Sequence, residues 1–148
     1  MLSRGERAKQ LFSEGYNCCQ AVVGAFADCV DMEFDALMKL ASSMGGGMGR
    51  LREVCGAVTG VFLVAGLLRG YSDPKATTEK AEHYRFIQSL AEAFREENGS
   101  IICRELLGEQ TGGITHVPEK RTNAYYQKRP CGELCRDAAD ILEKALQQ

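Results

Sequence analysis

Apolar residues recur at steps of three and four along most of this chain, and no segment has the strict apolar-polar alternation of a half-buried strand. The spacing predicts helices over about residues 4–13, 18–30, 34–42, 53–70, 77–97 and 131–145, with a shorter one over 100–107. The stretch MGGGMGR at residues 44–50 is a break that an α-helix does not tolerate. We therefore expect one all-α domain over residues 1–148, a bundle of about six helices.

The helix predicted over residues 53–70 is apolar on nearly every side, which predicts a buried central helix. Its apolar run, residues 54–68, is shorter than the roughly 20 residues that cross a bilayer, and it contains Thr59, Gly60 and Gly66. A membrane span is therefore not expected.

The last two long helices each have one apolar face. Over residues 77–97 the inward stripe is predicted to be Tyr84, Ile87, Ala91 and Phe94. Over residues 131–145 it is Cys131, Leu134, Cys135, Ala138, Ile141, Leu142 and Ala145. Residues 108–130 between them are polar and glycine-rich, which predicts a long loop that acts as a lid or a partner surface.

Composition and charge exclude some classes of partner. Of the 148 residues, 45% are hydrophobic and 26% are charged, as in an ordinary globular protein, and the formal net charge is -2. A nucleic-acid-binding domain usually has a basic surplus on one face, so we expect neither nucleic acid nor a membrane surface as a partner. The N-terminal residues lack the apolar segment of a secretory signal, so we expect a cytoplasmic protein.

The cysteines are the outlier in this composition. There are seven of them: Cys18, Cys19, Cys29, Cys55, Cys103, Cys131 and Cys135. In a reducing cytosol, an odd and dispersed set indicates metal binding or thiol redox chemistry more than structural disulfides. The alternative is that each cysteine is a small buried hydrophobe.

Four of these cysteines fall in the first turn of a predicted helix, namely Cys18, Cys55, Cys103 and Cys131. A helix N-terminus carries unpaired amides and a partial positive charge, which lowers the pKa of a thiol and favours the thiolate that ligates metals and attacks disulfides. Brought together, the four would form a site for a soft metal, an iron-sulfur cluster or a redox dithiol pair. Cys29 lies about 16 Å along its helix from Cys18 and cannot share that site. Cys19 and Cys135 either join it or are packing residues.

Glycines follow Cys55 at the spacing of one helix face. Gly56 and Gly60 leave room there for a second backbone or a flat ligand, and the alternative is a tight helix crossing without a ligand. Thr59 is four residues from Cys55, close enough for its hydroxyl to bond that sulfur. The amides of MGGGMGR would either cradle an anion or a cluster sulfide beside Cys55 or serve only as a connector. The segment has neither the dinucleotide nor the Walker pattern.

Other kinds of chemistry have no signature in the chain. His83 and His116 are expected at the surface, C-x-x-C does not occur, and nothing indicates a Ser-His-Asp site. No catalytic residue is assigned, and the sequence leaves open whether the protein is an enzyme.

Four motifs in order resemble a family that is described as redox-active and named for its C_GCAxxG_C_C cysteine signature: GYNCCQAV, MGGGMGRLREVCGAVTG, NGSIICRELLG and RPCGELCRDAADIL. The resemblance covers residues 15–142 and implies that the signature cysteines are Cys18, Cys55, Cys103 and Cys131. It also implies a small helical redox protein that holds a prosthetic group. The glycine that the signature places before its second cysteine is Val54 here. The family is distantly similar to split-Soret cytochrome c, but C-x-x-C-H is absent here, so covalent c-type haem is not expected.

Three functions follow as hypotheses. The first is electron transfer by an iron-sulfur cluster, or by another metal or prosthetic group, bound by the four signature cysteines beside Gly56 and Gly60, with a redox partner protein. The second is a metal-free thiol-disulfide carrier. The third is a helical protein-interaction scaffold with structural cysteines. The sequence leaves open whether the protein forms a homo-oligomer.

Overall fold

The computed structural model describes residues 2–108 and 114–148. Over these ranges the chain forms helices and no β-strand, which confirms the all-α prediction. In chain order the elements are α1 (Arg4–Ser13), α2 (Cys18–Ala25), the 3-10 helix η1 (Ala27–Cys29), α3 (Phe34–Ser42), α4 (Gly45–Met48), α5 (Gly56–Arg69), α6 (Thr77–Asn98), α7 (Cys103–Leu107), α8 (Asn123–Lys128) and α9 (Cys131–Leu146).

Side-chain caps explain where the first two helices begin. Ser3 before α1 and Asn17 before α2 each accept a hydrogen bond from the amide three residues further on. The residues at those positions, Glu6 and Gln20, bond back to the cap amide and complete a capping box. Asn17 therefore fixes the start of α2 as predicted, and with it the position of Cys18.

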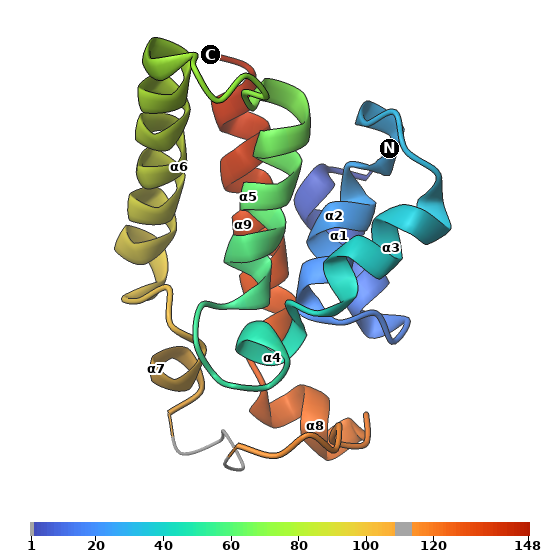
Figure 1. The fold of residues 1–148 in the computed structure, drawn as a ribbon. Helices are drawn as coiled ribbons and strands as arrows, with labels where there is room; N and C mark the ends of the chain where they lie inside the picture. Colours follow the sequence, from blue (N-terminus) through green and yellow to red (C-terminus); the bar gives the residue numbers. More distant parts are fainter. Residues whose placement is uncertain (1, 109–113) are drawn as a thin grey trace.

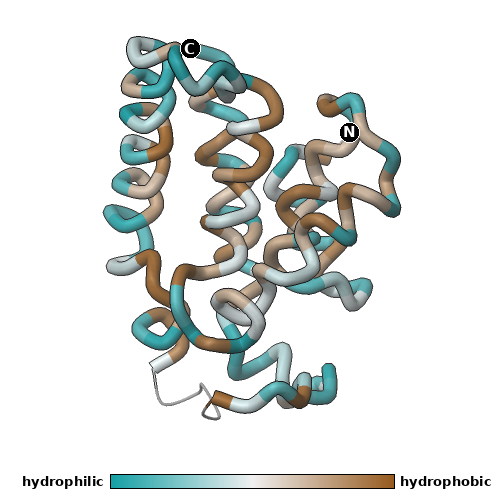
Figure 2. Tube along the Cα trace, viewed as in Figure 1, coloured by the Kyte–Doolittle hydropathy of each residue, from teal (hydrophilic) through white to brown (hydrophobic). Residues whose placement is uncertain are grey.

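The centre of the bundle is the crossing of α2 and α5, and α9 packs against α1, α2, α5 and α6. The helices α5, α6 and α9 lie side by side (Figure 1). Colouring by hydropathy shows α5 largely apolar and the outer side of α6 hydrophilic (Figure 2). Eight residues of α5 are buried, so the predicted buried central helix is confirmed.

α5 begins at Gly56 rather than near Glu53. The amide of Cys103 donates to the carbonyl oxygen of Glu53 at 2.6 Å, and the amide of Cys55 donates to that of Ile101 at 2.8 Å. Residues 53–55 therefore pair with the segment before α7 instead of forming a helical turn.

The predicted inner stripe of α6 was partly wrong. Phe94 is buried, as is Leu90, which the prediction omitted, and Ile87 and Ala91 are half-buried. Tyr84 is 51% exposed, and its hydroxyl pairs with that of Tyr71 at 3.0 Å instead of entering the core. The buried face is therefore rotated away from Tyr84.

Short elements gather at one end of the bundle. There, α4, α7 and α8 surround the beginnings of α5 and α9 (Figure 1). Of the predicted loop over residues 108–130, residues 114–130 lie at this end and contain α8, whereas residues 109–113 lie outside the described residues. Among the described helices, none has both the length and the apolarity needed to cross a membrane.

Candidate functional site

The four cysteines predicted from helix starts border one cavity of about 300 Å³ at this end of the bundle. Cys18, Cys103 and Cys131 are the first residues of α2, α7 and α9, and Cys55 immediately precedes α5. Segments far apart in the sequence therefore bring their thiols to a common volume. Its size is at the lower end of the range of about 300–1,000 Å³ found for small-molecule sites.

The glycines after Cys55 allow α5 to approach α2 closely. A Cβ at position 56 would lie 2.3 Å from Sγ of Cys18, and a Cβ at position 60 would lie 3.0 Å from Cβ of Val22. Gly56 also borders the cavity, whereas Gly60 only packs against α2. Gly60 therefore allows the tight crossing of the two helices. Gly56 allows the same crossing and also lines the cavity.

The glycine-rich segment forms a left-handed turn around the cavity. Met48, Arg50 and Arg52, none of them glycine, have φ angles of 70°, 67° and 63°. This conformation costs a non-glycine residue about 1–2 kcal/mol. A Cβ at Gly47 would lie 2.6 Å from Cβ of Cys103, so the turn packs directly on α7. The predicted helix break is confirmed, because Gly46 and Gly47 are non-helical within the short α4.

Backbone amides reach two of the cavity sulfurs. The backbone of Gly46 hydrogen-bonds the Cys18 sulfur, and that of Ala57 hydrogen-bonds the Cys55 sulfur; both contacts lower the thiol pKa. Burial is the larger effect in each case and raises the pKa of Cys18, and raises that of Cys55 well above 9.0. Burial likewise raises the pKa of Cys131 to about 12.

The prediction that the helix starts lower the thiol pKa was therefore wrong for Cys18, Cys55 and Cys131. Removal from water disfavours the thiolate more than the amides and the helix ends favour it. Burial therefore favours the protonated form of these thiols, and metal binding to them would be coupled to release of the proton.

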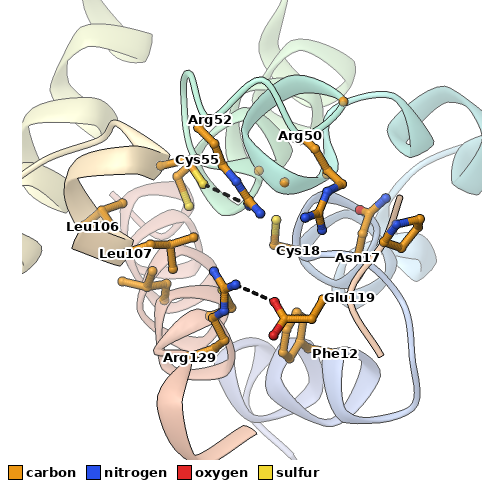
Figure 3. Close-up of a pocket in the computed structure, with 18 of the residues that line it drawn as sticks. Phe12, Asn17, Cys18, Arg50, Arg52, Cys55, Leu106, Leu107, Glu119 and Arg129 are labelled. Atoms are coloured by element: carbon orange, nitrogen blue, oxygen red, sulfur yellow. Dashed lines mark hydrogen bonds and ion pairs between the residues drawn. The ribbon is translucent and has the colours of Figure 1, made fainter. Parts of the chain in front are cut away.

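Four arginines border the same cavity: Arg50, Arg52, Arg121 and Arg129. Arg52 is 5% exposed, and its Nη1 lies 3.8 Å from Sγ of Cys103. The Arg129 side chain is 6% exposed and pairs with Glu119 at 2.5 Å. Figure 3 shows the ends of Arg50 and Arg52 directed toward the Cys18 sulfur, with Arg129 entering from the other side.

Sequence reasoning missed these arginines, because a charged side chain in a polar segment is normally solvated. One usable signal was their position, since Arg52 and Arg129 stand shortly before Cys55 and Cys131.

The described part of the predicted lid covers one side of the cavity. Arg121 donates to the carbonyl oxygens of Phe12 at 2.7 Å and Tyr16 at 2.9 Å, and its guanidinium lies 4.1 Å from the centre of the Phe12 ring. Arg50 donates from Nε to the carbonyl oxygen of Thr115 at 2.9 Å. These contacts fix residues 114–130 to α1 and to the glycine-rich turn.

The two histidines differ in position. His116 is exposed as predicted, but it borders the cavity. His83 is half-buried on α6, with its ring 6.1 Å from that of Tyr71, and it is not part of the cavity lining.

The remaining cysteines lie outside the cavity lining. Cys29 is exposed beside Arg4, while Cys19 and Cys135 are fully buried. Cys135 lies under the site, with Sγ 3.7 Å from the carbonyl oxygen of Cys18. Thr59 hydrogen-bonds the Cys19 thiol and donates to the carbonyl oxygen of Gly56, so the predicted contact of Thr59 with Cys55 was wrong.

No group of three or more His, Cys, Asp or Glu side chains in residues 2–108 and 114–148 is arranged to hold a single metal ion. A tetrahedral zinc site would need its sulfur ligands about 2.3 Å from one point. The four thiols instead border a volume.

The structure is a helical bundle in which four separate helix starts bring thiols to one arginine-lined cavity, and this arrangement defines a class of small cysteine-motif protein. The signature of one such family matches residues 16–145, and its description is "Putative redox-active protein (C_GCAxxG_C_C)". The chain belongs to this family. Comparison with curated proteins and with solved structures gave no match.

Proposed function

We propose that the protein transfers electrons through an iron-sulfur cluster held by Cys18, Cys55, Cys103 and Cys131, in exchange with a redox partner protein. The observation that carries the proposal is that these four thiols, from four helix starts, border one cavity. Cysteine thiolates are the usual ligands of such clusters. When bound, the cluster would accept and return an electron.

The donor set suits a cluster better than a single ion. A cluster places several iron and sulfide atoms between its thiolates, so its ligands surround a volume, as the four cysteines do here. A cluster with four thiolate ligands carries negative charge. The guanidinium groups of Arg52 and Arg129 border the cavity, and the backbone of Gly46 and of Ala57 reaches the Cys18 and Cys55 sulfurs, so both would help to stabilise that charge.

The residues of this chain have separable roles in that site. Burial raises the pKa of Cys18, Cys55 and Cys131, so binding of the metal by these three residues would be coupled to release of their thiol protons. Arg121 holds residues 114–130 over the cavity and limits access of water. Gly56 lets α5 come close enough to α2 for Cys18 and Cys55 to face the same volume.

Anaerobic purification from cells supplied with iron tests the proposal. We expect the wild-type protein to contain iron and acid-labile sulfide and to be coloured in the visible range. Cys55→Ser should lose most of the iron, and the matched control Cys29→Ser, at an exposed thiol outside the cavity, should retain it. Iron-free wild-type protein, or equal iron loss in both variants, would contradict the proposal.

A metal-free dithiol carrier is the second candidate, favoured by the contact of the Cys18 sulfur with Gly56, the neighbour of Cys55. In this reaction the Cys18 and Cys55 thiols give up two protons and two electrons and form an S–S bond, while a disulfide of a partner protein is reduced to two thiols. Thiol titration before and after oxidised glutathione would show the loss of two thiols in the wild type. An unchanged count rejects this candidate.

A further inference from the structure

We propose that Arg50, Arg52 and Arg129 form an oxyanion-binding subsite beside Cys18, and that the molecule on which the cavity acts is therefore a small oxyanion or the phosphate end of a small ester. The inference deepens the proposed function by naming a substrate class. Oxyanion binding does not require a cluster, so the subsite and the proposed electron transfer can be refuted separately.

The three guanidinium groups converge although they come from two segments. Arg50 and Arg52 extend from the glycine-rich turn into the space beside Cys18 (Figure 3). Arg129, which precedes Pro130 and α9, reaches the same space from the other side. Burial and the nearby charges of Arg52 and Arg129 lower the pKa of Arg50. The chain therefore holds these like charges close together in a partly dehydrated volume, where they repel one another.

The described lining carries more positive than negative charge. Four arginines border the cavity, and Glu119 is the carboxylate among the described residues that line it. Glu119 pairs with Arg129, whereas Arg50 and Arg121 donate to neutral carbonyl oxygens. The excess of positive charge in the described lining therefore favours an anionic ligand.

The chemistry of the guanidinium group indicates that the bound anion has several oxygen atoms. Its planar fork donates two parallel hydrogen bonds to the oxygens of carboxylate, sulfate or phosphate groups. The cavity of about 300 Å³ admits a small molecule only. Glu119, whose side chain is 46% exposed, lies where it competes with the ligand for Arg129 and repels it.

Calorimetric titration of the reduced, cluster-free protein with sulfate tests the subsite, with sodium chloride adjusted to keep the ionic strength constant. We expect saturable binding in the wild type, weakened about tenfold or more in Arg50→Gln and in Arg129→Gln. Glu119→Gln should bind sulfate more tightly, because a competing carboxylate is removed. The matched control is Arg95→Gln, because Arg95 pairs with Glu92 on the exposed face of α6. Absence of saturable heat in the wild type, or equal weakening in Arg50→Gln and Arg95→Gln, would overturn the assignment.

Further titrations distinguish a free oxyanion from the phosphate end of a larger molecule. They also test whether sulfate binding depends on the cluster. Tighter binding of glycerol phosphate than of inorganic phosphate would identify the end of a larger molecule, and the reverse would identify a free oxyanion. Cys55→Ser should keep sulfate binding even where it loses iron. Sulfate binding that disappears once a cluster is loaded would overturn the substrate assignment, because the arginines would then serve the cluster alone.

Discussion

Gly56 and the sulfur of Cys18 are in contact across the crossing of α5 and α2, and a Cβ at position 56 would lie 2.3 Å from that sulfur. Gly56→Ala should therefore lower the free energy of unfolding by about 1–3 kcal/mol, the usual cost of overpacking, and should displace the Cys18 thiol from the cavity. Gly66→Ala in the same helix is the control. A Cβ there meets nothing within 4 Å, so we expect a gain of about 0.5–1 kcal/mol. Urea unfolding at pH 7 measures both, and equal effects would contradict the close contact.

The buried thiol of Cys19 predicts a loss of stability in alkali. Its pKa is raised by burial to about 12 in the folded protein, from 9.0. Well below pH 9 the thiol is protonated in both states, so its contribution to stability is fully present. Between pH 9 and about 12 only the unfolded thiol ionises, so the free energy of unfolding falls by up to about 1.4 kcal/mol per pH unit. Urea unfolding at several pH values should show a shallower decline in Cys19→Ala; identical slopes would count against this pKa.

Arg121 is predicted to hold residues 114–130 over the cavity. Arg121→Gln removes two hydrogen bonds to the backbone of α1 and its following turn, and removes the contact with the Phe12 ring. We expect local destabilisation of about 1–3 kcal/mol, seen as faster amide hydrogen exchange in α8 while α5 keeps its protection. Lys120→Gln, at the exposed neighbouring position, should leave exchange in α8 unchanged. Unchanged protection in Arg121→Gln would show that the segment is held by other contacts.

The carboxylate of Asp140 on α9 caps the first turn of α1. Its Oδ1 accepts a hydrogen bond from the amide of Gly5 at 2.9 Å. Asp140→Ala leaves this amide without its partner and should cost about 1 kcal/mol in the free energy of unfolding. Asp140→Asn retains an oxygen acceptor and should lose distinctly less. Thermal unfolding of the two variants at one pH tests the difference, and an equal loss would assign the effect to charge rather than to the cap.

The helix starts were the part of the site that local sequence could predict. Asn17 caps α2, and Pro130 immediately precedes α9, so the positions of Cys18 and Cys131 at helix beginnings follow from short-range rules. The common cavity was a hypothesis from that pattern, and the four cysteines do border one cavity.

What the sequence could not predict depends on tertiary packing. The direction of the thiol pKa shifts is set by how deeply the thiols are buried, which no local motif determines. Thr59 bonds Cys19 across the α2–α5 crossing rather than Cys55 in its own segment. Arg52 is buried at a position with a left-handed φ of 63°, a backbone conformation that its residue type does not predict.

The order of the four thiols along the chain has a consequence for biosynthesis. Cys18 is made early and Cys131 opens the last helix, so the chain must be synthesised through α9 before the wall of the cavity is complete. A bridge between these two cysteines can therefore be completed only after Cys131 has emerged from the ribosome.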